Sequence, residues 1–204
     1  MKRFACALAY ALIGCSGNTT APTPQMQSKY ELTVRLADIG KTCTAESPAF
    51  ALTGARLDSV PNARRGGSDG LWYDAARELP GGIGGIFLDH GNYYVWLVDT
   101  TKKAEAFAGL AAKGFGGLFP FDKAVALKAR WDFAQLSEWF AYVVPRALEG
   151  ENVRSLDIQE AHNRLEFGVA DENARRAVEA KLKGLDIPCN LVALFLQDPI
   201  GFSR

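Results

Sequence analysis

The residues that could form a catalytic site are few and widely spaced. Gly66 to Gly70 reads Gly-Gly-Ser-Asp-Gly, which matches the G-x-S-x-G pattern of a serine nucleophile. That chemistry requires a buried strand immediately before the serine and a base within reach of it. Pro61 to Arg65, which precedes the pattern, is too polar for a buried strand. We therefore interpret Ser68 as part of a glycine-rich loop over Ser59 to Gly70.

The titratable candidates give no stronger signal. His90 and His162 lie in expected hairpin turns, and neither has a second histidine at the spacing of a metal-binding motif. Asp89 and Asp157 begin the same turns, where short carboxylates accept bonds from backbone N–H groups. The glycine-rich runs lack the Lys-Ser/Thr sequel of a phosphate-binding loop. We expect no metal, no cofactor and no enzymatic activity.

Aromatic residues are the remaining candidates for a binding site. They could form a platform on which the sugars of a glycan or of peptidoglycan stack. The alternative is that they belong to the core or to half-buried sheet surface. The residues concerned are Trp72, Trp96, Trp131, Trp139, Tyr93 and Tyr94.

The elements that position these residues begin with a hairpin. Ile86 to Asp89 and Tyr93 to Val98 are rich in β-branched and aromatic residues and predict two strands. Between them, His90-Gly91-Asn92 suits a tight turn because Gly and Asn tolerate positive φ. Asp99 or Thr100 can then cap a helix with an apolar face. The unit is strand, turn, strand, helix.

The second half predicts a ferredoxin-like, β-α-β-β-α-β sandwich within an α+β protein. Asp132 and Asp171 are the expected caps of its two helices, and Pro145 should kink the first helix or end it early. Its elements are strands at 124–130, 153–158, 163–169 and 191–196 and helices from 133 and 172. Further strands are expected at 30–37 and 50–57, and a helix at 71–79.

The two halves share a pattern. Asn92 aligns with Asn163, and Trp96 aligns with Phe167, at one common offset. The first half is therefore either a related strand-turn-strand-helix unit or an independent α+β arrangement whose sheet continues into the second. We divide the chain into a leader (1–14), a tether (15–28), an N-terminal subdomain (29–122) and a C-terminal subdomain (123–204).

Composition excludes some function classes. The 204 residues are 48% hydrophobic, which is enough for a sizeable core. Basic and acidic residues balance at 23 each, so no basic excess marks a nucleic-acid-binding surface. We expect no nucleic-acid partner.

The N-terminus resembles the signal peptide of a bacterial lipoprotein. Lys2 and Arg3 precede an apolar segment that ends Leu12-Ile13-Gly14-Cys15, which is similar to a lipobox. The resemblance implies that Cys15 is acylated and becomes the first mature residue, anchoring the chain in the membrane. Ser16 stands where an aspartate retains enterobacterial lipoproteins at the inner membrane, so an outer-membrane or surface location is implied. The alternative is an ordinary secretory signal with an incidental cysteine.

Two of the four cysteines then remain, Cys43 and Cys189. An oxidising compartment favours a disulfide between them. The bridge would join residues 146 positions apart and stabilise the fold by at most about 4–5 kcal/mol through chain entropy. The alternative is two separate buried thiols.

The segments Gly84 to Asp99 and Ser155 to Val169 are similar to the propeptide domains of α-lytic and streptogrisin-type secreted serine proteases. Both contain a strand with an aspartate, a turn, and a hydrophobic strand. The resemblance implies a non-catalytic domain that binds a protein partner in the envelope, in a propeptide-like or inhibitor-like manner. An envelope structural or glycan-binding module is the alternative function. The expected contact residues lie in the C-terminal segment, which could instead be a frayed end: Gln197, Asp198, Pro199, Ile200 and Phe202.

Overall fold

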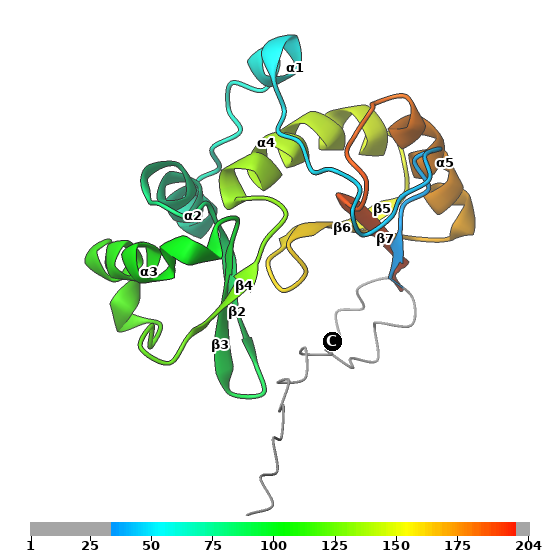
Figure 1. Cartoon of the computed structure of the whole chain (residues 1–204). Coiled ribbons are helices and arrows are strands. Elements are labelled where there is room, and N and C mark those ends of the chain that lie inside the picture. Colours follow the sequence, from blue (N-terminus) through cyan, green and yellow to red (C-terminus); the bar gives the residue numbers. More distant parts are fainter. Residues whose placement is uncertain (1–33, 199–204) are drawn as a thin grey trace, which may run out of the picture.

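A computed structural model describes residues 34–198 and shows a mixed α+β fold, as the sequence predicts (Figure 1). The strands are β1 (Arg35–Leu36), β2 (Ile83–Asp89), β3 (Asn92–Leu97), β4 (Val125–Lys128), β5 (Val153–Gln159), β6 (Arg164–Val169) and β7 (Val192–Leu196). The α-helices are α1 (Gly54–Asp58), α2 (Gly67–Glu78), α3 (Lys103–Ala112), α4 (Phe133–Val143) and α5 (Glu172–Lys183). Short 3₁₀ turns lie at Thr100–Lys102 and Phe115–Gly117, and a π-helical turn lies at Val144–Leu148.

The strands form two mixed sheets. In the smaller sheet, β3 lies between β2 and β4 and is antiparallel to β2 and parallel to β4. In the larger sheet the order is β1-β7-β6-β5. There β6 is antiparallel to β5 and parallel to β7, while β1 pairs antiparallel with β7.

Both halves repeat one order of elements: a helix, a hairpin, a second helix, and a strand parallel to the second hairpin strand. The elements are α2-β2-β3-α3-β4 in one half and α4-β5-β6-α5-β7 in the other. They share an irregularity, because the hairpin register shifts between Ile83 and Gly85 and again between Val153 and Ser155. The repetition of strand, turn, strand and helix is thus present in the fold.

The strand β4 lies where the sequence predicts the first strand of the C-terminal half, but its hydrogen bonds go to β3. The reason is that α3 returns the chain across the smaller sheet, so β4 enters beside β3 as the parallel strand of a β-α-β crossover. The fourth strand of the larger sheet is β1 instead.

The strand predicted over Phe50 to Leu57 is wrong. The chain is irregular up to Thr53, and α1 begins at Gly54. Leu52 is buried, and the ring of Phe50 lies edge-on to that of Trp139, with centroids 5.8 Å apart. These apolar residues are therefore buried by packing on α4 rather than by pairing in a sheet.

The predicted tight turn between β2 and β3 is present, but its positive-φ residues are His90 and Gly91 rather than Gly91 and Asn92. His90 and Gly91 have φ of +46° and +79°, and Asp89 pairs with Asn92 across the turn. This is the type I′ geometry, which follows the right-handed twist of the two strands.

Aspartates cap the helices as predicted. The Asp99 carboxylate accepts from the Thr101 N–H at 3.0 Å, at the 3₁₀ turn that leads into α3. Asp132 and Gln135 form a reciprocal capping box at the start of α4. Asp171 accepts two backbone N–H groups at the start of α5.

Helix α4 joins the two halves. It contacts α2 and β2 on one side and β5 and β6 on the other, and Figure 1 shows it running across the top of both sheets. Its Phe133, Leu136 and Trp139 are completely buried in a core that extends through both halves. At Val143 the α-helix changes to the π-helical turn that contains Pro145, so the predicted early end is confirmed.

The predicted disulfide between Cys43 and Cys189 is confirmed. It links the segment that follows β1 to the segment that precedes β7, two regions 146 residues apart in sequence.

Candidate functional site

The residues considered for catalysis lie apart from one another in the sheet and helix framework. The loop predicted over Ser59 to Gly70 is wrong for its last four residues, because α2 begins at Gly67. Ser68 is exposed in the first turn of this helix, and the chain before it is irregular, so a nucleophile elbow is not formed. His90 is exposed at the tip of the β2–β3 hairpin, with Nδ1 2.8 Å from Asp89 Oδ1. His162 lies in the β5–β6 turn, with Nδ1 2.7 Å from Glu166 Oε1. Each histidine thus pairs with a carboxylate of its own hairpin.

Most of the tryptophans belong to the core. Trp72, Trp131 and Trp139 are at most 8% exposed, which excludes them from a surface platform. Tyr94 and Trp96 differ, because they alternate along β3 with the fully buried Val95 and Leu97. They therefore lie on the face of the smaller sheet that is turned away from the helices.

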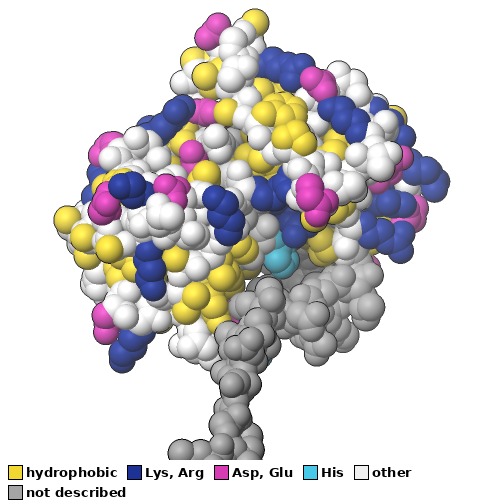
Figure 2. Space-filling model, in the orientation of Figure 1, with side chains coloured by type: hydrophobic (Ala, Val, Ile, Leu, Met, Phe, Trp, Pro, Cys, Tyr) yellow, Lys and Arg dark blue, Asp and Glu magenta, His cyan; other side chains and the backbone are white. Residues whose placement is uncertain are grey.

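This outer face carries a continuous apolar surface. Phe87 of β2 lies opposite Tyr94, and on the other side of β3 Val125 pairs with Tyr94 and Leu127 with Trp96. We call these five residues the aromatic strip. The three aromatic side chains are half-buried, and Val125 is 43% exposed. Figure 2 shows hydrophobic side chains gathered over the hairpin region.

The rings of the aromatic strip are stacked on one another. The Phe87 ring lies 5.1 Å from that of Tyr94, with 18° between the planes, and 5.9 Å from that of Trp96, with 29° between the planes. Phe87 therefore covers part of one face of Tyr94 and part of one face of Trp96. A sugar ring stacks on an open aromatic face, so this arrangement suits an apolar polypeptide better than a glycan.

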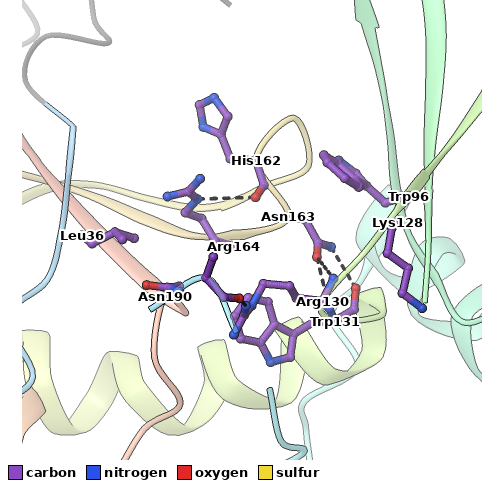
Figure 3. A pocket seen from close by; sticks show the side chains of 10 residues that line it. Leu36, Trp96, Lys128, Arg130, Trp131, His162, Asn163, Arg164 and Asn190 are labelled. Atoms are coloured by element: carbon purple, nitrogen blue, oxygen red, sulfur yellow. Dashed lines mark hydrogen bonds between the residues drawn. The ribbon is translucent and has the colours of Figure 1, made fainter. Parts of the chain in front are cut away.

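Next to the aromatic strip is a cavity of about 430 Å³, which we call the cleft. Figure 3 shows Arg164 and His162 of the β5–β6 hairpin on one side of it and Trp96 on the other. It is lined by Leu36, Ala45, Trp96, Lys128, Arg130, Trp131, His162, Asn163, Arg164 and Asn190. Both halves of the fold thus contribute to its walls.

The cleft is basic. Lys128, Arg130 and Arg164 line it, whereas its described lining includes no carboxylate. Figure 2 shows basic side chains beside a histidine at the hollow between the two halves. Arg130 has a structural part in addition, because its terminal nitrogens donate to the carbonyls of Ala45 at 2.8 Å and Ser47 at 2.5 Å.

Asn163 holds the two halves together at the cleft. Its Oδ1 accepts from the N–H groups of Arg130 at 2.9 Å and Trp131 at 3.1 Å, and its Nδ2 donates to the Trp131 carbonyl at 2.8 Å. The residue is 4% exposed and has φ of +51°, which asparagine tolerates better than most residues. A Cβ at Gly84 would lie 2.6 Å from Asn163 Nδ2, so only glycine allows this approach.

Glu160, in the same β5–β6 turn, lies against the backbone of Gly85 in β2. Burial raises the pKa of Glu160 to about 7, with a further contribution from the nearby Asp157 and Asp69 carboxylates. Below this pH the side chain is neutral and fits the contact between the halves. Above it a desolvated charge is held beside two like charges.

We predict that Glu160→Gln stabilises the protein at alkaline pH. The unfolded carboxyl ionises near 4.5 and the folded one near 7, so the free energy of unfolding of the wild type should fall as pH rises through this window. At pH 8 the variant should be more stable by about 2 kcal/mol, after discounting for partial exposure. Urea unfolding at pH 5 and pH 8 measures this. Glu105→Gln on α3 is the exposed control, and an equal Glu160→Gln effect at both pH values would contradict the prediction.

The sequence interpretation missed Phe87, Asn163 and the basic residues of the cleft as functional residues. Asn163 was detectable in principle, because asparagine before a strand is a common positive-φ residue. Lys128, Arg130 and Arg164 come together only because the two halves pack against each other. No local sequence pattern could therefore have predicted that they line one cavity.

The residues expected to contact a partner lie partly outside the described chain. Gln197 Oε1 accepts from Ser155 Oγ at 2.6 Å, so this side chain is bound within the domain, and Asp198 is exposed. Pro199, Ile200 and Phe202, like the lipidation residue Cys15, lie outside the described residues.

No protein-family model, curated protein or solved structure matches the chain. In the part that the structure describes, no cluster of His, Cys, Asp and Glu side chains is suited to hold a metal ion. No helix between residues 34 and 198 is long and apolar enough to cross a membrane.

Proposed function

We propose that this chain is a lipid-anchored lipoprotein of the bacterial envelope, at the outer membrane or cell surface, whose domain binds another envelope protein and catalyses no reaction. The anchor is supported by the lipobox-like Leu12 to Cys15. The binding proposal is supported chiefly by one observation: the aromatic strip is an apolar sheet face that continues into a basic cleft.

The composition of the aromatic strip fits a protein interface. Contiguous apolar patches on soluble domains commonly mark interaction sites, and Phe, Tyr and Trp are enriched at the centres of interfaces. Tyr and Trp side chains in such positions often account for most of the binding free energy. The alternative function, an envelope structural or glycan-binding module, is supported by the presence of Tyr94 and Trp96 but not by the way that their faces stack on Phe87.

Propeptide-like or inhibitor-like binding is the most specific form of this proposal. It rests on the resemblance to propeptide domains of α-lytic and streptogrisin-type proteases and makes a serine protease one candidate partner. We also propose that the two subdomains, 29–122 and 123–204, are related units and that the second is ferredoxin-like. Its support is that α4 and α5 both contact β6 in a four-stranded sheet, in which β1 takes the place that the sequence assigns to β4.

Photocrosslinking in intact cells tests the binding proposal. A benzoylphenylalanine placed at Val125, in the aromatic strip, should capture one defined envelope protein, and the same group at the exposed Arg176 of α5 should not. Tyr94→Ser should lower this capture by about tenfold, the effect of losing an aromatic interface residue. Leu118→Ser, which removes a 71% exposed apolar side chain outside the aromatic strip, is the matched control.

Equal capture from Val125 and Arg176, or capture unaffected by Tyr94→Ser, would contradict the proposal. Crosslinking to glycan strands would favour the alternative module. The N-terminal peptide of the same purified protein tests the anchor separately, because it should begin at an acylated Cys15, and recovery of an unprocessed Met1 would contradict lipidation.

A further inference from the structure

Three buried hydrogen-bond donors in residues that line the cleft lack acceptors. Trp96 Nε1, Trp131 Nε1 and Arg130 Nε are buried and have no hydrogen-bond partner among the described residues, and all three residues line the cleft. Indole and guanidinium N–H groups donate only, so each can be satisfied only by an acceptor atom. These unpaired N–H groups add to the positive potential at the cavity, which favours a ligand rich in oxygen atoms.

The charge of the cleft selects an anionic ligand. Arg164 adds a guanidinium whose only described contacts are long ones from Nε, 3.4 Å to the His162 carbonyl and 3.8 Å to Glu166 Oε1. Glu166 is instead bound closely by His162, at 2.7 Å. The two terminal nitrogens of Arg164 therefore remain for a bidentate contact, the geometry in which arginine binds carboxylates.

Trp96 connects the cleft to the aromatic strip. It stacks with Phe87 on the sheet face, and its indole also lines the cleft opposite Arg164 (Figure 3). A polypeptide whose apolar side chains cover the strip would therefore bring the next part of its chain to the cleft and to Arg164. The anionic group of an unmodified polypeptide is a carboxylate.

We propose that the cleft binds a carboxylate of the partner polypeptide, from an acidic side chain or from the C-terminus, beside the apolar residues that cover the aromatic strip. Arg164 pairs with the carboxylate oxygens, whereas the Lys128 ammonium is held by the Val98 carbonyl. Trp96 supports the adjoining apolar residue. This inference rests on the proposed function and specifies what the domain recognises.

Peptide display on the full-length chain in detergent micelles tests this proposal. Random peptides with free C-termini should be enriched for Asp, Glu or the terminal carboxylate next to apolar residues. Synthetic versions of an enriched peptide, with each acid replaced by its amide and the C-terminus amidated in turn, identify which carboxylate is used. The correct amide should bind on the order of tenfold more weakly, as expected for a lost charge-assisted pair. Inorganic phosphate serves as a competing anion.

Variants assign the effect to the cleft. Arg164→Gln should bind the acid and amide peptides within about twofold of each other, whereas Arg176→Gln on α5 should keep the tenfold preference. If Arg164→Gln does not fold, Trp96→Phe, which keeps the ring and removes an unpaired donor, should also weaken binding of the acid peptide.

The outcomes separate the two proposals. Enriched peptides that lack acids but depend on Tyr94, or an acid preference retained by Arg164→Gln, would overturn carboxylate recognition and leave strip binding intact. Phosphate binding in preference to every peptide carboxylate would also overturn it. Enrichment of no peptide would overturn polypeptide binding itself, and carboxylate recognition with it.

Discussion

Asn163→Ala is expected to lower the free energy of unfolding by about 3–5 kcal/mol. The substitution leaves the N–H groups of Arg130 and Trp131 and the Trp131 carbonyl without partners, and an unsatisfied buried group costs about 1–3 kcal/mol. Alanine also disfavours the left-handed backbone by about 1 kcal/mol. Urea unfolding followed by circular dichroism provides the measurement.

Asn190→Ala is the matched control for this prediction. Asn190 also has positive φ, +65°, but its side chain makes one hydrogen bond, to the Thr44 carbonyl at 3.0 Å, near the surface. The backbone cost is therefore the same in both variants, and the difference between them isolates the buried hydrogen bonds. Two variants of equal stability would show that Asn163 does not hold the halves together.

Loss of the Cys43–Cys189 bridge is expected to lower the free energy of unfolding by up to about 4–5 kcal/mol. The bridge joins residues 146 positions apart, and the chain entropy of the unfolded state rises when so long a loop is released. It also fixes one wall of the cleft, since Ala45 and Asn190 lie beside the two cysteines and line the cavity.

Urea unfolding with and without reductant tests this expectation. The reduced wild type and the Cys43→Ser, Cys189→Ser double variant should show the same lowered midpoint, and reductant should not change the midpoint of the variant. A midpoint of the wild type that reductant leaves unchanged would show that the bridge has no stabilising effect.

Much of the fold could be predicted because the signals are local. Alternation along residues 164–169 predicts β6, a Gly-Asn turn predicts the β2–β3 hairpin, and Asp132 and Asp171 predict two helix starts. The disulfide could also be predicted. The N-terminus implies an oxidising compartment, and Cys43 and Cys189 are the two cysteines that remain to pair there.

The rest depends on long-range packing. The alternation of apolar residues near Phe50 and Leu52 resembles a strand, but it is satisfied by burial against Trp139. The pairing of β4 with β3 depends on the path of α3. The residues of 124–130 therefore predict a strand but not its partner. The sequence does not indicate which of Trp96 and Trp131 is buried. In the structure Trp96 is half-buried on the outer face of the smaller sheet, whereas Trp131 is fully buried.

The candidate site was less accessible to sequence analysis than the fold. Tyr94 and Trp96 were named for a platform, and both lie on the exposed sheet face. Their stacking on Phe87 depends on the register of β2 against β3, which places Phe87 opposite Tyr94. The cleft arises between the two halves and therefore cannot be detected in either half alone.

Hydroxyl-radical footprinting tests most directly whether the aromatic strip is a binding surface. The chain would be oxidised in intact envelopes and again after purification in detergent, and modification would be quantified residue by residue. The account predicts that Phe87, Tyr94 and Trp96 are protected in the envelope relative to the purified chain, while Leu118 is oxidised equally in both. Equal oxidation of Tyr94 and Trp96 in the two preparations would contradict it.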